Sequence, residues 1–227
     1  MSRRFRDIEI LEDRNRLEPG ERRFTDVRYF RVRNLYHDSE PSREYRLDMV
    51  SHRGVDAVCS VPYHFDNGIC RILMIKSFRP VLKLRPLAPE PEPFLWEIVA
   101  GVLEDGEHTL DGVKKRSADE LQEEAGIKVD WRDVEIMGEP MYMSPGIYTE
   151  KIWFTAVETD IGKRLPAEHD GSVQEELIEQ HEFSLEEALD CLRHGIIKDA
   201  KTEIAIYRLK EMLAGRLSVR AGAEEIG

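Results

Sequence analysis

The sequence predicts an α+β protein in which strands pair into a sheet and helices pack against it. Two apolar runs, 56–65 and 69–79, are joined by an Asn-Gly turn at 66–68, a pattern typical of a β-hairpin. Residues 111–126 show helical periodicity that ends at a glycine, as helices commonly do. Residues 184–195 begin with a serine and carry a glutamate three positions later. That pair predicts a capped helix.

The first fifty residues predict a small β-rich segment. Residues 25–36 and 42–50 have strand-like composition, and the HDSEPS sequence between them is typical of a turn. Neither face of the first strand is cleanly polar, which favours a strand at an interface over one in a core. We therefore expect an N-terminal segment over 1–52, a main domain over 53–216 and a flexible tail over 217–227.

The remaining elements follow in order. Residues 80–93 hold five of the eleven prolines and predict a surface loop without regular structure. Residues 94–101 predict one short strand that ends in a glycine. Strands are also expected over 134–140 and 151–159, with a loop between them, and a further apolar-periodic helix over 202–214.

Composition excludes several classes of protein. The chain has 227 residues, with 33 basic and 45 acidic residues and a net charge of −12. Because phosphate neutralisation needs surplus Lys and Arg, nucleic acid is not an expected partner. The three cysteines are scattered and form no disulfide or zinc pattern. No stretch approaches the roughly 18 apolar residues of a membrane span, and no apolar segment of a secretory signal follows the start. We expect a cytoplasmic protein that has no membrane partner.

Three carboxylates gather at the end of the predicted helix 111–126. Glu120 and Glu124 lie four residues apart and share a helix face, with Glu123 beside them. Like charges at this spacing repel, and the helix dipole disfavours carboxylates at a C-terminus. The cluster is therefore either a solvated acidic face or a binding site for a cation. Oxygen ligands favour Mg²⁺, with Mn²⁺ possible.

The surroundings of this cluster favour the second interpretation. Gly101, Glu107 and the run E-L-Q-E-E-A-G-I at 120–127 resemble the Nudix box, G-x5-E-x7-R-E-U-x-E-E-x-G-U. The segments SFRP, LWEIVAG, SPGIYTEKIWF and LIEQHEFSLEEAL resemble the branch that contains pyrophosphatases of ADP-ribose and nucleoside-diphosphate sugars. The resemblance extends over about 170 residues. It implies the Nudix fold, an α/β/α sandwich with a mixed sheet between helices, and a homodimer formed through the N-terminal segment.

Two departures from the box stand out. Asp119 occupies the position of the box arginine, and eleven residues instead of seven separate it from Glu107. Arg116 lies four residues before Glu120, and Lys115 lies four before Asp119, so either can supply the missing positive charge. Four extra residues add about one helical turn. We expect the insertion to lengthen the start of the helix without rotating its acidic end.

The resemblance implies roles for individual residues. Glu120, Glu124 and the carbonyl of Ala100 are the implied metal ligands. The choice of Ala100 also has a physical reason, because Gly101 allows the chain to turn and frees this carbonyl to face a cation. Glu123 is implied as a ligand or as a catalytic residue near the metal. Glu97 is a candidate for substrate binding, with an outward-facing strand residue as the alternative.

The remaining roles fall outside the box. In this branch the catalytic base comes from a later loop, which corresponds to residues 169–179 here. Glu176 is the expected base, and Glu175 is the alternative. If neither is catalytic, the segment is a solvated acidic loop. Arg79 is expected to contact a substrate phosphate, since a guanidinium suits bidentate phosphate binding. The aromatic residues Phe24, Tyr29 and Phe30 favour a dimer interface, with stacking on a base as the alternative.

The leading hypothesis is a metal-dependent hydrolase that splits ADP-ribose or a related nucleoside-diphosphate sugar into a nucleoside monophosphate and a sugar phosphate. The substitution by Asp119 and the insertion motivate a rival, a Nudix-fold binding or regulatory module with weak or lost catalysis. RNA decapping is a third hypothesis, but the acidic balance disfavours it.

Overall fold

The computed structural model describes residues 25–37, 40–52, 54–87, 92–167 and 179–224, of which 216–224 are described as backbone only. The main body is an eight-stranded sheet, and its strands in chain order are β3 (Ala57–Asp66), β4 (Ile69–Phe78), β5 (Phe94–Glu97), β6 (Val99–Val102), β7 (Glu135–Ile136), β8 (Met141–Tyr142), β9 (Lys151–Glu158) and β10 (Glu179–Ser184). The helices are α1 (Leu110–Ala125), α2 (Leu185–Arg193) and α3 (Ala200–Glu224). The 3₁₀ turns η1 (Pro80–Leu84), η2 (Trp131–Asp133) and η3 (Ile161–Lys163) lie in connections between other elements.

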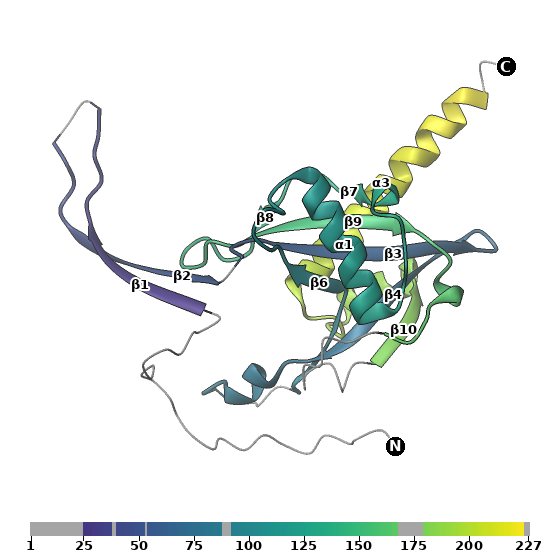
Figure 1. Ribbon diagram of the computed structural model, residues 1–227, viewed down its shortest axis with the longest axis horizontal. Helices are drawn as coiled ribbons and strands as arrows, with labels where there is room; N and C mark the ends of the chain where they lie inside the picture. The colour runs from purple at the N-terminus through teal and green to yellow at the C-terminus, as the bar shows by residue number, and fades with distance from the viewer. Residues whose placement is uncertain (1–24, 38–39, 53, 88–91, 168–178, 225–227) are drawn as a thin grey trace.

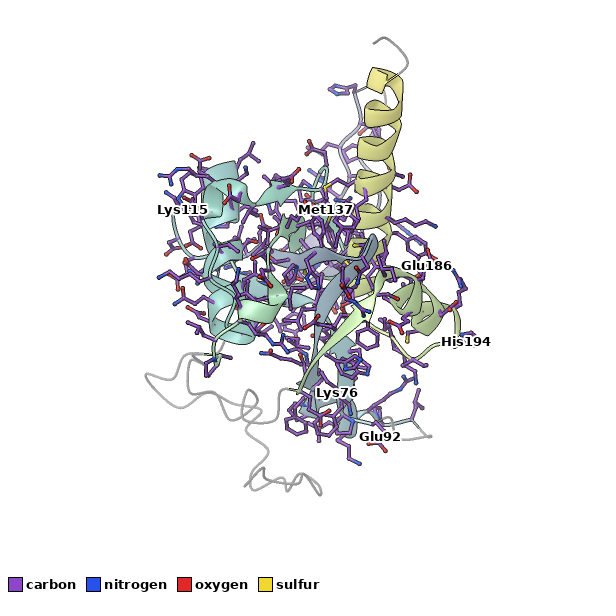
Figure 2. All side chains as sticks on the ribbon, turned by 90° about the vertical axis from the view of Figure 1, so that its right-hand side faces the viewer. Lys76, Glu92, Lys115, Met137, Glu186 and His194 are labelled. Atoms are coloured by element: carbon purple, nitrogen blue, oxygen red, sulfur yellow. The ribbon has the colours of Figure 1, made fainter. Side chains whose placement is uncertain are left out.

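The sheet is mixed and lies between helices on both faces. Its central strand β3 pairs in parallel with β9 and antiparallel with β4 and β6. Helix α1 crosses one face of the sheet, and α3 lies against the other (Figures 1 and 2). The predicted α/β/α sandwich is therefore confirmed.

The alternation of side chains along β3 explains why both faces are covered. Cys59, Val61 and Tyr63 join the cluster that includes α2 and α3, whereas Val58 packs with Val113 of α1. All four β3 side chains are fully buried. A strand buried on both faces reads as a continuous apolar run in the sequence, as residues 56–65 do.

The segment 94–102 fills a gap in the middle of the sheet. β3 and β4 pair next to their hairpin turn, where Tyr63 lies opposite Ile72. Further along they separate, and β5 pairs with β4 while β6 pairs with β3. The prediction of one continuous strand over 94–101 was wrong, because the chain changes pairing partner at Ile98. This change places residues 97–101 at the centre of the sheet.

Helix α1 has defined ends. The Thr109 side chain accepts a hydrogen bond from the Gly112 amide, and the helix ends at Gly126 with φ 68°. A Cβ at Gly126 would lie 1.8 Å from the carbonyl oxygen of Leu165. Both the left-handed backbone and the close approach therefore require glycine here. The predicted capping box of α2 is also confirmed, with Ser184 and Glu187 bonded reciprocally.

The N-terminal strands form a separate antiparallel hairpin of β1 (Thr25–Val32) and β2 (Tyr45–His52), which projects from the main body (Figure 1). Most of its apolar residues are exposed, and Tyr29 is 77% exposed. The end of β2 is attached to the 144–150 loop: the Val50 amide donates to Ile147 O at 2.8 Å. The His52 Nε2 lies 2.8 Å from Glu150 Oε1.

Three predicted elements need correction. Residues 80–93 include the 3₁₀ turn η1 as well as loop, because proline fits the first turn of a helix. Only Glu135 and Ile136 form a strand within 134–140. Helix α3 runs to Glu224, so residues 217–224, predicted as a frayed tail, continue the helix.

Candidate active site

Strand β6 and the end of α1 bring the box residues together. A Cβ at Gly101 would lie 1.8 Å from Glu120 Oε1, so the Glu120 carboxylate lies directly against the Gly101 backbone. The Ala100 amide donates to Glu124 Oε2 at 3.2 Å. The two glutamates that share a face of α1 thus both reach residues 100–101, and the absence of a side chain at Gly101 makes the space for one of them.

Arg116 connects Glu120 to Glu107. Its Nε donates to Glu107 Oε2 at 3.0 Å and its Nη2 to Glu107 Oε1 at 3.1 Å, the bidentate geometry that a guanidinium favours. Its Nη1 lies 3.8 Å from Glu120 Oε1. Burial raises the pKa of Glu107, but the bonds from Arg116 and from the Glu104 amide outweigh it and hold the pKa below its usual range.

Asp119 and Lys115 face the other way. Lys115 Nζ lies 5.0 Å from the centre of the Trp131 ring, and Figure 2 shows Lys115 on the outer side of α1, away from the sheet. Asp119 is exposed and lines a hollow of about 570 Å³ with Lys115, Trp131 and their neighbours. Two side chains were candidates to replace the box arginine. Arg116 lies at the box carboxylates, whereas Lys115 lies against Trp131.

The donor set suits a hard divalent cation. Glu120, Glu123 and Glu124 are partly buried at the end of α1, and carboxylate and carbonyl oxygens are the ligands that Mg²⁺ and Mn²⁺ prefer. Glu120 and Glu124, both against residues 100–101, fit such an ion as a pair of ligands. Among the residues that the structure describes, no three His, Cys, Asp or Glu side chains converge closely enough to hold a metal on their own.

Arg79 and Glu97, both predicted to bind substrate, bind each other. Arg79 Nε donates to Glu97 Oε1 at 3.0 Å, and Nη2 donates to Glu97 Oε2 at 2.5 Å. The hydrogen bond to Glu97 raises the pKa of Arg79 further. Glu97 is only 1% exposed, so the alternative of an outward-facing strand residue is wrong. The Arg79 side chain is 40% exposed and can meet a ligand.

Sequence reasoning missed the groups that support Glu97 from α3. Lys201 Nζ lies 3.1 Å from Glu97 Oε2 and 2.8 Å from Asp199 Oδ1. Asp199 directly precedes Ala200, the first residue of α3. An aspartate before an apolar-periodic helix is a recognisable N-cap signal, although its link to Glu97 is invisible in the sequence.

The expected bases Glu175 and Glu176 lie outside the described residues, as does Phe24. The chain on either side of 168–178 is hydrogen-bonded near the candidate metal ligands. The Leu165 amide donates to Gly126 O at 2.8 Å, and Gln180 Nε2 donates to Glu124 O at 3.0 Å. Both flanks of the segment are therefore bonded to the C-terminal end of α1, next to the candidate metal ligands.

Within the described residues no helix is long and apolar enough to cross a membrane.

Comparisons with known proteins identify the family of the chain. Residues 54–202 match the NUDIX domain family. The GDP-mannose pyrophosphatase of Cronobacter sakazakii (strain ATCC BAA-894) is 32% identical over 154 residues, which cover 65% of this chain and 75% of that protein. The ADP-ribose pyrophosphatase of Bacillus subtilis (strain 168) is 34% identical over 171 residues, covering 74% of this chain and 79% of that protein.

The fold has a solved counterpart. The crystal structure of an ADP compounds hydrolase superposes with a TM-score of 0.60 at 19% identity, covering 87% of this chain and 90% of the other. The predicted fold and the predicted class of enzyme, a hydrolase of phosphorus-containing anhydrides, are confirmed by these matches taken together. The family match spans the sheet, the α1 helix and its glutamates, and the chain belongs to the Nudix family.

Proposed function

We propose that this protein hydrolyses the pyrophosphate bond of a nucleoside-diphosphate sugar, with ADP-ribose and GDP-mannose as the first candidates. The reaction uses a divalent cation, with Mg²⁺ as the first candidate and Mn²⁺ as the second. Relatives named for these two substrates support the substrate class. The products are a nucleoside monophosphate and a sugar phosphate, and one water is consumed.

The observation that carries the proposal is the arrangement of Glu120 and Glu124 against residues 100–101, with Arg116 behind them. The rival hypothesis of a module with weak or lost catalysis rested on the loss of the box arginine and on the insertion before it. Arg116 supplies a guanidinium to the box carboxylates from one turn earlier in the helix, so the substitution by Asp119 does not argue against catalysis.

Each group has a chemical task in this proposal. Glu120 and Glu124, with the Ala100 carbonyl, would hold the cation, and Glu123 is a further ligand or a group that orients one. A bound divalent ion neutralises phosphate oxygens and acidifies water. Arg79, held by Glu97 through Nε and Nη2, would present the Nη1 side of its guanidinium to a phosphate. Glu176, or Glu175, would accept the proton of the attacking water.

A direct experiment tests the proposal. The purified protein is incubated with Mg²⁺ and a panel of nucleoside-diphosphate sugars, and the phosphate released after addition of a phosphatase is measured. AMP with ribose 5-phosphate from ADP-ribose, or GMP with mannose 1-phosphate from GDP-mannose, is the expected result. No release from any compound of the panel, with either Mg²⁺ or Mn²⁺, would contradict it.

We further propose that residues 1–52 form a dimerisation segment of a two-fold homodimer. The hairpin exposes apolar side chains on both faces, namely Val27, Tyr29, Phe30, Tyr45 and Leu47. A two-stranded hairpin is marginally stable by itself, so a covering surface is expected. Between the hairpin and the 144–150 loop lies a hollow of about 750 Å³ lined partly by Tyr29, Phe30 and Ile147. A monomer at micromolar concentration in light scattering would contradict this proposal.

A further inference from the structure

A chain of four alternating charges runs from the surface into the body of the protein. Arg79 binds Glu97, Glu97 Oε2 lies 3.1 Å from Lys201 Nζ, and Lys201 lies 2.8 Å from Asp199 Oδ1. The side chains of Glu97, Lys201 and Asp199 are 2%, 16% and 15% exposed. Buried charges are costly unless they are paired, and here the formal charges sum to zero.

A second connection holds the backbone at the same place. Asp199 Oδ2 accepts hydrogen bonds from the Thr202 amide at 3.0 Å and from Thr202 Oγ1 at 2.6 Å. The Thr202 Oγ1 in turn accepts from the Ile98 amide at 3.1 Å. Ile98 stands between β5 and β6, and this bond satisfies a buried amide outside the strand pairing. The first turn of α3 therefore fixes both the side chain of Glu97 and the backbone of the next residue.

We infer that Lys201, with Asp199 and Thr202, is a positioning element that orients Arg79 through Glu97 for the substrate's phosphate. The inference deepens the proposed function and rests on it, because it takes the partner of Arg79 to be a phosphate. Lys201 lies at the Oε2 atom of Glu97 and so fixes the plane of the Glu97 carboxylate. Because the Arg79 guanidinium is bonded to both oxygens of this carboxylate, its orientation is fixed as well.

Charge balance gives Lys201 a second effect on the same arginine. Without the Lys201 ammonium, Glu97 and Asp199 are two carboxylates balanced by Arg79 alone, so the local charge changes from zero to −1. A phosphate that approaches Arg79 would then meet a weaker positive potential. The expected consequence is weaker substrate binding, with the chemical step largely retained.

The test is a double-mutant cycle of Lys201→Met and Glu97→Gln, with KM and kcat measured for the best substrate of the panel. Lys201→Met is expected to raise KM about tenfold, with kcat within about threefold, the pattern of lost uniform binding. Because Lys201 acts through Glu97, the two changes should be strongly non-additive. The matched control is Lys198→Met, which removes an exposed lysine three residues away and should leave KM unchanged.

A spectroscopic measurement separates positioning from a merely structural role. The Arg79 Nε–H donates to Glu97, so its ¹H–¹⁵N resonance, identified by its absence in Arg79→Lys, reports the geometry of this bond. We expect it to shift or broaden in Lys201→Met and to stay in place in Lys198→Met. If Lys201→Met does not fold, Lys201→Arg keeps the charge, alters the geometry and enters the same comparison.

Two outcomes would overturn the inference: independent effects of Lys201→Met and Glu97→Gln on KM, or an Arg79 Nε–H resonance unchanged by substitution of Lys201. The resonance is measured in the folded protein without substrate. A wild-type protein that hydrolyses nothing would therefore overturn the proposed function, while the resonance would still decide whether Lys201 positions Arg79.

Discussion

Arg116 and Glu107 form a bidentate ion pair across nine residues of sequence, with N–O distances of 3.0 and 3.1 Å. The pair joins the loop that precedes α1 to the face of the helix that carries Glu120. Close packing of the loop on the helix allows it: a Cβ at Gly112 would lie 2.3 Å from the carbonyl oxygen of Glu107. Helix α1 thus retains a cation at its box carboxylates.

The first prediction compares Arg116→Met with Lys115→Met. Loss of Arg116 releases both Glu107 and Glu120, so kcat/KM should fall by about 10- to 100-fold, the usual effect of removing a group that orients metal ligands. Loss of Lys115 removes only an exposed contact with Trp131, worth about 0.5–1 kcal/mol of stability. Steady-state kinetics over a Mg²⁺ titration makes the comparison. Equal losses in the two variants would show that Arg116 has no special role.

The sequence predicted those features of the fold that depend on neighbouring residues. The capping box at Ser184 and Glu187 and the glycine stop at Gly126 are local patterns, and the structure contains both. The spacing of Glu120 and Glu124 on one helix face is equally local. These predictions needed only helix geometry.

The features that the sequence could not predict involve distant partners. Strand pairing changes at Ile98 because β3 and β4 diverge, and nothing within 94–101 encodes that divergence. Lys201 contacts Glu97 from 104 positions away, and the choice of Arg116 over Lys115 depends on where Glu107 folds back. In each case the partner is set by tertiary packing, which local patterns do not specify.

The second prediction contrasts two glycines. In Gly101→Ala the new Cβ meets the flexible Glu120 carboxylate, which can move aside, so the protein should fold while kcat falls about 100-fold, as for a misplaced catalytic group. In Gly126→Ala the Cβ meets a backbone oxygen at positive φ, so stability should fall by more than about 1 kcal/mol.

Thermal unfolding and kinetics of the two glycine variants test this contrast. Gly215→Ala in α3, where a Cβ meets nothing within 4 Å, is the control for the substitution itself. Normal turnover in Gly101→Ala would show that the position of Glu120 does not matter.

The third prediction concerns metal binding. Glu124→Gln removes one negative charge but keeps an oxygen that can accept the Ala100 amide, so the local fold should persist. We expect turnover to fall about a hundredfold or more, comparable to loss of a major electrostatic stabiliser of the transition state. Binding of Mn²⁺, followed by electron paramagnetic resonance, should weaken in the same variant. Glu211→Gln, on an exposed face of α3, is the control, and near-normal turnover of Glu124→Gln at saturating Mg²⁺ would refute the assignment.

The last prediction concerns the base. A carboxylate bound to a cation is a poor proton acceptor, because the metal's charge lowers its pKa. The base should therefore be a carboxylate other than Glu120 and Glu124. Both flanks of the segment that contains Glu175 and Glu176 are bonded to the end of α1, through Leu165 to Gly126 and through Gln180 to Glu124. The bonding of both flanks next to the candidate metal ligands supports the choice of this segment as the source of the base.

Glu176→Gln should lower kcat by about 10² to 10⁴, the usual contribution of general base catalysis, and leave Mn²⁺ affinity nearly unchanged. The contrast with Glu124→Gln, which should lose both, distinguishes a base from a metal ligand. Glu175→Gln is the matched neighbour: if it carries the loss instead, the base is Glu175. If neither substitution slows turnover, the base lies elsewhere. Glu123 and Glu150 are then the next carboxylates to replace. Glu150 is included because its pairing with His52 holds it at the junction of the hairpin and the main body.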